Sequence, residues 1–269
     1  MEEREKSGPY QAHDGDTLTP ALAKKICVTG MHRSGTSLVA MWLNRCGVAF
    51  AQDQLLGARP FNRKGHYEDT RLAALHSLVI KRRLPKSKGW IVTRDREFTF
   101  DKEYEGIARE IISSYNKSYS TWGWKDPRMS MVLKTWKKLI PDLKMVSVWR
   151  PADAVVASLV KRSFGTASRD ARLGILEAIQ SWKIYNKKIL EYCELFPDDT
   201  LLMPLDEIIR KDVEAIQLIR ARFDVNLKIL PISEVYDDQL LTTSKSNFLS
   251  VFPGIAETTR QLQKYSSVF

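Results

Sequence analysis

A glycine-bounded loop near the start of the chain has the residue types and spacing of a phosphate site. Gly30-Met31-His32-Arg33-Ser34-Gly35-Thr36-Ser37 has the frame of a phosphate-binding loop, G-x-x-x-x-G-K-[ST], with threonine in the lysine position. Glycines permit a tight turn, and the N–H groups at a helix N-terminus attract an anion. Arg33 supplies a cation from within the loop. The pattern predicts a phosphate site here; the simpler alternative is a glycine turn with Arg33 in solvent.

This loop resembles the 5′-phosphosulfate-binding loop of the sulfotransferase superfamily, commonly P-K-S-G-T-[ST] or P-R-S-G-[ST]. It is similar in particular to bacterial sulfotransferase family proteins with a GMHRSGTS loop. The resemblance implies that the co-substrate is 3′-phosphoadenosine 5′-phosphosulfate (PAPS), with no metal. It also implies that the loop residues hold the 5′ end of that nucleotide: His32, Arg33, Ser34, Gly35, Thr36 and Ser37.

The resemblance extends to a second anion site, an arginine at a strand end followed eight residues later by a serine. Arg150 and Ser158 have this spacing, and in the family such a pair holds the 3′-phosphate. An arginine at a strand end can present a planar fork to phosphate, and a serine two helical turns further can donate a hydroxyl. The alternatives are an ion pair for Arg150 and a small packing residue at Ser158.

The chain departs from animal members of the family where they contact adenine. Leu38 stands where they have a tryptophan, and their late R-K-G-x-x-G-D-W segment is absent. The segment Met203-Pro204-Leu205-Asp206-Glu207 lacks the tyrosine of their Y-E-D segment. Lys161, Arg162 and Arg169 are candidates for covering the nucleotide, but an ordinary solvated loop is the favoured interpretation.

The catalytic residues are also assigned through the resemblance. Glu68, in a segment similar to the family's G-x-x-E, is the first candidate for the general base; a carboxylate in the first turn of a helix is its alternative explanation. His66 is the second candidate, because histidine titrates near neutral pH. Arg33 and Lys125 would stabilise developing charge. Asp126 could orient a partner, act as base or begin a helix, and His76 fits a packed histidine.

Apolar periodicity predicts the elements that must position these residues. Strands and helices alternate, which favours an α/β fold with a central parallel sheet flanked by helices, similar to P-loop proteins. Ligands of such sheets bind at the carboxyl ends of the strands. The expected strands are Lys25–Thr29, Thr121–Trp124, Lys144–Trp149 and Thr200–Met203. The expected helices are Thr36–Cys46, Glu68–Arg83, Tyr104–Asn116, Ala171–Leu195 and Val213–Phe223, together with a helix that Pro151 opens.

Composition restricts the setting of the protein. The 269 residues carry a net charge of +10, and residues 1–23 hold five acids against two bases, which predicts a polar tail before a single domain at 24–269. A basic body indicates an anionic partner; with two phosphate motifs we expect a nucleotide rather than nucleic acid. Three isolated cysteines fit a reducing compartment. The absence of a signal peptide and of about 18 consecutive apolar residues favours a cytoplasmic protein without membrane insertion.

Three function classes therefore remain open at the level of sequence. The favoured one is a PAPS-dependent sulfotransferase acting on a hydroxyl or amine of a glycan, small metabolite or peptide. The second is an ATP-dependent phosphotransferase, and the third is a non-catalytic module that binds anionic ligands. The absence of GxSxG and HExxH patterns and of a His/Cys ligand cluster disfavours hydrolases and metalloenzymes.

Overall fold

A parallel sheet forms the centre of the molecule. The computed structural model describes residues 23–50, 55–56, 66–87, 91–164, 173–235 and 248–267. Within these residues the sheet has four strands in the order β2-β1-β3-β4, all parallel, so that β1 lies between β2 and β3. This confirms the predicted α/β class. The strands are β1 (Lys24–Gly30), β2 (Thr121–Lys125), β3 (Lys144–Trp149) and β4 (Thr200–Pro204).

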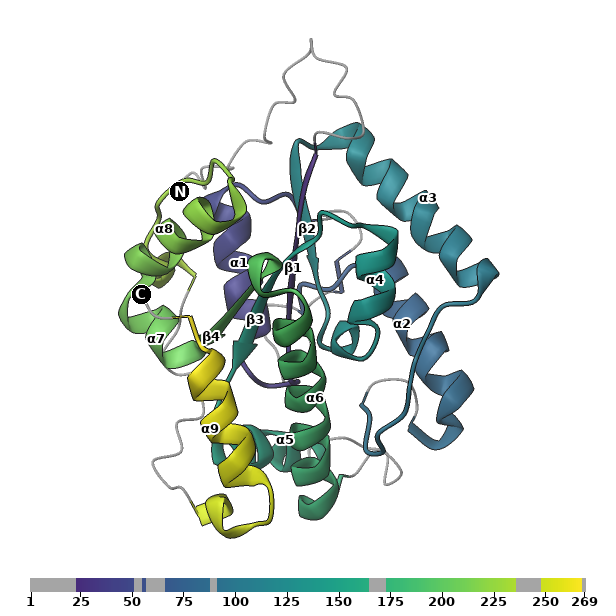
Figure 1. The fold of residues 1–269 in the computed structure, drawn as a ribbon, viewed down its shortest axis with the longest axis vertical. Coiled ribbons are helices and arrows are strands. Elements are labelled where there is room, and N and C mark those ends of the chain that lie inside the picture. The colour runs from purple at the N-terminus through teal and green to yellow at the C-terminus, as the bar shows by residue number, and fades with distance from the viewer. Residues whose placement is uncertain are drawn as a thin grey trace, which may run out of the picture.

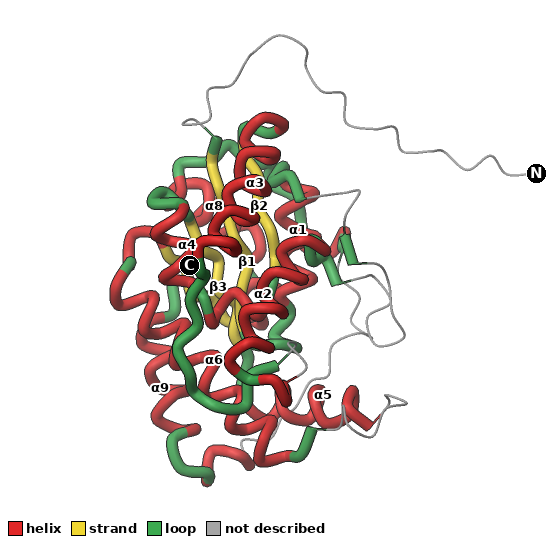
Figure 2. The backbone as a smooth tube through the Cα atoms, turned by 90° about the vertical axis from the view of Figure 1, so that its right-hand side faces the viewer, coloured by secondary structure: helices red, strands yellow, loops and turns green. Residues whose placement is uncertain are grey.

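Helices cover both faces of this sheet (Figures 1 and 2). One face packs against α1, α7 and α8, and the other packs against α2, α3, α4, α5, α6 and α9. The helices are α1 (Thr36–Cys46), α2 (Thr70–Arg83), α3 (Lys102–Ser118), α4 (Leu133–Leu139), α5 (Ala152–Phe164), α6 (Ile175–Leu195), α7 (Leu205–Arg210), α8 (Asp212–Phe223) and α9 (Ile255–Tyr265).

Strand β1 shows how the sequence produces the layers. Its side chains alternate between the two cores: Cys27 packs with the α6 side, and Ile26 and Val28 pack with the α1 side. Gly30 is the last residue of the strand, and a Cβ there would lie 2.1 Å from the Val148 carbonyl oxygen. Only glycine therefore lets the start of the loop approach β3 this closely.

Most helix boundaries agree with the predicted ones, with instructive exceptions. Helix α1 has the expected bounds, and Gly47 ends it at φ 119°. Helix α2 begins at Thr70 because the Asp69 side chain accepts from the N–H groups of Arg71 and Leu72. Glu68 therefore lies outside the helix, and its explanation as a first-turn acid is wrong.

Other differences concern the start of one predicted helix and three helices that the sequence pattern did not indicate. Helix α6 begins at Ile175, and the expected start at residue 171 lies outside the described residues. Helices α4, α7 and α9 were not predicted. Of the polar tail expected at 1–23, residues 1–22 lie outside the described part, and Ala23 is buried in the core. None of the helices within the described ranges is long and apolar enough to cross a membrane.

Candidate active site

The phosphate-type loop turns sharply between the central strand β1 and helix α1. The Ser34 N–H donates to the Met31 carbonyl at 3.1 Å, and both Arg33 (φ 70°) and Gly35 (φ 87°) adopt left-handed backbone conformations. A non-glycine residue at positive φ is uncommon and is concentrated at binding sites. Alternating backbone conformations of this kind direct successive N–H groups into an anion-binding concavity. The local geometry is therefore that of a phosphate cradle.

The second predicted anion motif lies directly against this loop. The Arg33 Nε donates to the Ser158 Oγ at 2.9 Å, and the Arg150 Nη1 donates to the Arg33 carbonyl at 3.1 Å. The contact follows from the topology, because β3 pairs with β1 and its carboxyl end presents Arg150 beside the loop. The two motifs thus form one continuous site rather than two separate ones.

Arg162 is the third arginine of this site, after Arg33 and Arg150. Arg162 lies on α5 one helical turn after Ser158, so the expectation of a solvated loop for Lys161 and Arg162 is wrong; Arg169 lies outside the described residues. Burial, followed by the charges of Arg162 and Arg150, lowers the pKa of Arg33 to about 10. Arg33 remains a cation at neutral pH. Repulsion among the three clustered cations costs free energy. A bound phosphate dianion would offset this cost.

Two further features of the loop fit a bound nucleotide. The Ser34 Oγ is buried and has no hydrogen-bond partner within the described part of the chain, so it can still bond a ligand. Gly35 is enclosed by α7, because a Cβ at this position would lie 2.5 Å from the Leu205 Cδ2. Leu205 therefore supports the back of the loop. The residues present fit the 5′ end of PAPS.

The neighbouring strand on the other side of β1 presents the candidate catalytic groups. Lys125 ends β2, and its Nζ donates to the Glu68 Oε1 at 2.7 Å. The Arg128 Nη2 forms an ion pair with the Glu68 Oε2. All three side chains are buried. Glu68 is thus an ion-paired carboxylate in the interior, at the carboxyl end of the sheet.

The His66 carbonyl connects the phosphate-type loop to this cluster. It accepts from the Ser37 Oγ at 3.1 Å and from the Lys125 Nζ at 2.9 Å. Ser37 belongs to the first turn of α1, so the loop and Lys125 meet at one atom. The structure gives the backbone of His66 this role, and the role of its ring as a second candidate base stays a prediction.

His32 is a buried residue of the loop. Its ring contacts Tyr185 edge to face at 5.5 Å between centroids. Burial, followed by the charges of Arg128 and Arg162, holds the pKa of His32 well below its usual range. The charges of Arg162 in the arginine cluster and of Arg128 in the Glu68 cluster therefore both disfavour the protonated imidazole. Its neutral form adds no further cation to the site.

Comparison with known proteins is consistent with this geometry. Residues 25–228 match the model of the Sulfotransferase family. The chain belongs to this family. The sulfotransferase domain of the curacin biosynthetic pathway is similar in structure, with a TM-score of 0.51, 14% identity and coverage of 92% of this chain and 99% of that one, which supports the fold. Sulfotransferase STF1 of Mycobacterium tuberculosis H37Rv matches with a TM-score of 0.47 and 12% identity, over 90% and 77% of the two chains.

A curated sequence relative covers a smaller part of the chain. A Caenorhabditis elegans protein named as a protein-tyrosine sulfotransferase is 26% identical over 135 residues, half of this chain and half of that protein. The chain thus spans about half the length of the curated relative that it matches.

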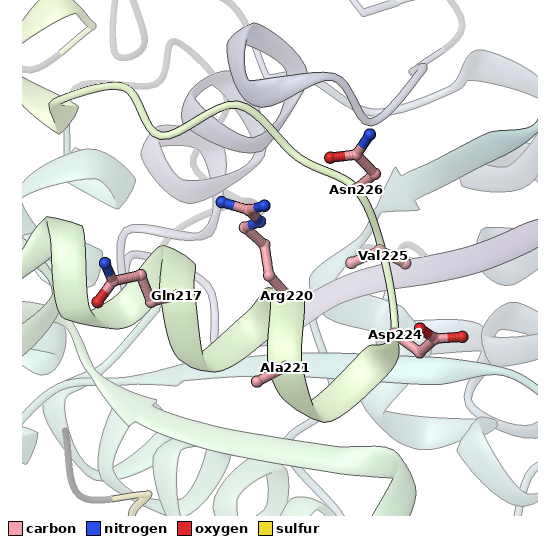
Figure 3. Close-up of a pocket in the computed structure, with 6 residues that line it drawn as sticks. All are labelled: Gln217, Arg220, Ala221, Asp224, Val225 and Asn226. Atoms are coloured by element: carbon pink, nitrogen blue, oxygen red, sulfur yellow. The ribbon is translucent and has the colours of Figure 1, made fainter.

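One cleft in the described part of the chain lies far from the charged groups. Figure 3 shows the cleft, of about 520 Å³, lined by Gln217, Arg220, Ala221, Asp224, Val225 and Asn226. Asp224 pairs with Lys24 at 2.9 Å, at the amino end of β1. A seven-residue strand places this cleft about 20 Å from Gly30. Among the described residues no group of three His, Cys, Asp or Glu side chains could hold a metal ion.

The sequence did not place two residues of this site: a solvated loop was the favoured interpretation for Arg162, and Arg128 had no assigned role. Arg162 follows Ser158 by four residues, and this helical spacing was a signal that could have placed it on the same face of α5. Arg128 lies two residues after Asp126, but its partner Glu68 is 60 residues away in the chain. No local pattern indicates that pairing.

Proposed function

We propose that this chain transfers a sulfuryl group from PAPS to a hydroxyl or amine of an acceptor. The observation that carries the proposal is the direct contact between Arg33 and Ser158, which merges the two anion motifs. A nucleotide phosphorylated at both the 3′ and 5′ positions has two anionic ends within the reach of one such site. ATP has no 3′-phosphate to engage Arg150 and Ser158.

The proposed reaction is an in-line displacement at sulfur. A bond forms between the acceptor oxygen or nitrogen and sulfur, while the bond from sulfur to the bridging phosphate oxygen breaks. The electron pair leaves with adenosine 3′,5′-bisphosphate, and the acceptor proton passes to Glu68. Positioning and electrostatic stabilisation supply most of the rate, as in phosphoryl transfer.

Each catalytic residue has a contact that supports its proposed role. An ionised carboxylate has about four acceptor positions, so Glu68 can keep Lys125 and Arg128 and still receive a proton from the acceptor. Lys125 borders both Glu68 and the loop through the His66 carbonyl, a place from which it can neutralise charge on the sulfuryl oxygens. Arg33 acts on the leaving phosphate by charge and hydrogen bonding.

The proposed acceptor classes are a glycan, a small metabolite or a peptide. Because the worm relative is named for tyrosine sulfation, a tyrosine-like phenol is the first probe to test.

Binding of nucleotides tests the donor assignment without any acceptor. Isothermal titration calorimetry would compare adenosine 3′,5′-bisphosphate with adenosine 5′-monophosphate, each with and without Mg²⁺. We expect the bisphosphate to bind at least about tenfold more tightly, since each charge-assisted hydrogen bond contributes about 1.5–3 kcal/mol, and Mg²⁺ to have no effect. Equal affinities, or binding that requires Mg²⁺, would favour the phosphotransferase alternative.

Turnover then tests the chemistry. Radiolabelled PAPS would be incubated with N-acetyltyrosine amide and with a panel of glycans and amines. We expect transfer that is lost in Arg33→Ala and Glu68→Gln variants that remain folded. Arg71→Lys is the matched control, because Arg71 pairs with Asp69, the neighbour of Glu68, and not with Glu68 itself. Full activity in Glu68→Gln would refute the assignment of the base.

A further inference from the structure

The contacts of Arg128 set this residue apart from the cations that face a ligand. Its Nε donates to the Asp126 Oδ1 at 2.8 Å, its Nη1 donates to the Ser77 Oγ at 2.9 Å, and its Nη2 pairs with Glu68. These partners belong to three segments: the end of β2, helix α2 and the stretch before α2. Arg128 is also buried. All three nitrogens of the guanidinium therefore have hydrogen-bond partners within the protein.

Asp126 fixes the orientation of Arg128. The Asp126 Oδ1 accepts from both the backbone N–H and the Nε of Arg128, each at 2.8 Å. The Asp126 Oδ2 lies 2.8 Å from the His76 Nδ1. Burial alone would raise the pKa of this carboxyl, but the charge of Arg128 and the contact with His76 hold it well below its usual range. Asp126 is therefore an ionised residue whose two oxygens are both engaged.

Trp136 determines which way His76 is bonded. The Trp136 Nε1 can only donate, and it lies 2.8 Å from the His76 Nε2. The Nε2 must therefore be the acceptor, so in the neutral ring the hydrogen is on Nδ1 and points at Asp126. The order of donation is Trp136 to His76, His76 to Asp126, and Arg128 to both Asp126 and Glu68.

We propose that Arg128 is a positioning residue for Glu68, held in place by Asp126, His76 and Trp136. This inference rests on the proposed role of Glu68 as the base. Arg128 fixes one carboxylate oxygen while Lys125 engages the other, so the plane of the carboxylate is set before the acceptor arrives. A shift of about 1 Å in such a group can cost about 100-fold in rate.

The same contacts would also serve a clamp between β2 and α2 with no influence on the reaction. The two roles differ in what they do to Glu68. A clamp stabilises the fold regardless of the orientation of the Glu68 carboxylate. A positioning residue affects the reaction only by orienting that carboxylate.

The test uses Arg128→Lys, which keeps the charge but loses the three-way fork, with Arg71→Lys as the matched control. A melting temperature and the affinity for adenosine 3′,5′-bisphosphate verify that the variants are folded. Crystal structures of the bisphosphate complexes should show that Glu68 changes position in Arg128→Lys and keeps its position in Arg71→Lys. An unmoved Glu68 in Arg128→Lys would overturn the inference.

Kinetics provide the second arm, with PAPS and N-acetyltyrosine amide as the probe. We expect Arg128→Lys to lower kcat by about 10- to 100-fold and to leave the KM for PAPS within about twofold. The same substitution in a Glu68→Gln background should cause no further loss. An equal loss in both backgrounds would identify a clamp. If the unaltered protein transfers no sulfuryl group to this probe, a tyrosine-like phenol is not its acceptor, and the crystal structures alone decide the positioning role.

Discussion

The Arg33 Nε lies 2.9 Å from the Ser158 Oγ, and this hydrogen bond joins segments 125 residues apart in the chain. A hydroxyl can accept one hydrogen bond and donate another. Ser158 can therefore hold the Arg33 guanidinium while its own hydrogen remains available to a phosphate oxygen. Arg150 bonds to the backbone of the same arginine, so the position of Arg33 depends on both residues of the second motif.

Replacement of Ser158 tests this coupling. Ser158→Ala removes both a hydroxyl that can bond the 3′-phosphate and the anchor of Arg33, so we expect the affinity for adenosine 3′,5′-bisphosphate to fall by about tenfold or more. The affinity for adenosine 5′-monophosphate should fall less, because this nucleotide loses only the anchoring of Arg33 and has no 3′-phosphate. Calorimetry with both nucleotides measures the difference.

The matched control for that experiment is Ser163→Ala on the same helix. The Ser163 Oγ donates to the Val160 carbonyl and is buried, so its loss tests the general effect of deleting a hydroxyl from α5. Nucleotide affinity in this variant should be unchanged. Equal losses for the bisphosphate and the monophosphate in Ser158→Ala would remove Ser158 from the 3′-phosphate site.

The sequence predicted those parts of the site whose residues lie close together in the chain. The loop could be recognised because its glycines, its cation and the following helix are adjacent in the chain. The spacing of Arg150 and Ser158 could be recognised because it lies on one strand–helix junction. Their approach to the loop follows from the pairing of β3 with β1.

The parts that escaped prediction depend on contacts across the sheet or on side-chain capping. Glu68 was given a helical first turn because the sequence did not reveal that Asp69 caps α2. Its ion pair with Arg128 requires contact between the end of β2 and the segment before α2, and the periodicity of the sequence does not predict that contact. The hydrogen bond between Trp136 and His76 is of the same kind, since it links helices α4 and α2 across a buried interface.

The buried His32 predicts an acid-sensitive stability. Its folded pKa is lowered, so below about pH 6.5 the unfolded chain binds a proton that the folded protein does not. The free energy of unfolding must therefore decrease as the pH falls from about 6.5 towards the folded pKa, by up to about 1.4 kcal/mol per pH unit for this group. A His32→Gln variant lacks this contribution.

Urea denaturation at several pH values between 5 and 8 measures the effect. The unfolding free energy of the unaltered protein should decline more steeply below pH 6.5 than that of His32→Gln. Two parallel curves would show that His32 takes up its proton in the folded state as readily as in the unfolded chain, contrary to its burial beside Arg128 and Arg162.

Two glycines with opposite surroundings test the shape of the loop. Gly35 has φ 87°, and a Cβ there would lie 2.5 Å and 2.7 Å from the two methyl carbons of Leu205. Gly35→Ala should therefore lower the free energy of unfolding by about 1–3 kcal/mol. Gly106 is exposed within α3 and has no atom within 4 Å of its Cβ position, so Gly106→Ala should raise it by about 0.5–1 kcal/mol.

A second substitution separates the two causes of strain at Gly35. Leu205→Ala removes the methyl groups that would clash but leaves the left-handed backbone unchanged. In denaturant unfolding, Gly35→Ala should therefore cost less in the Leu205→Ala background than alone, and the remaining cost would be that of the backbone conformation. If Gly35→Ala costs the same in both backgrounds, Leu205 does not restrict the loop, and its support of the phosphate cradle is refuted.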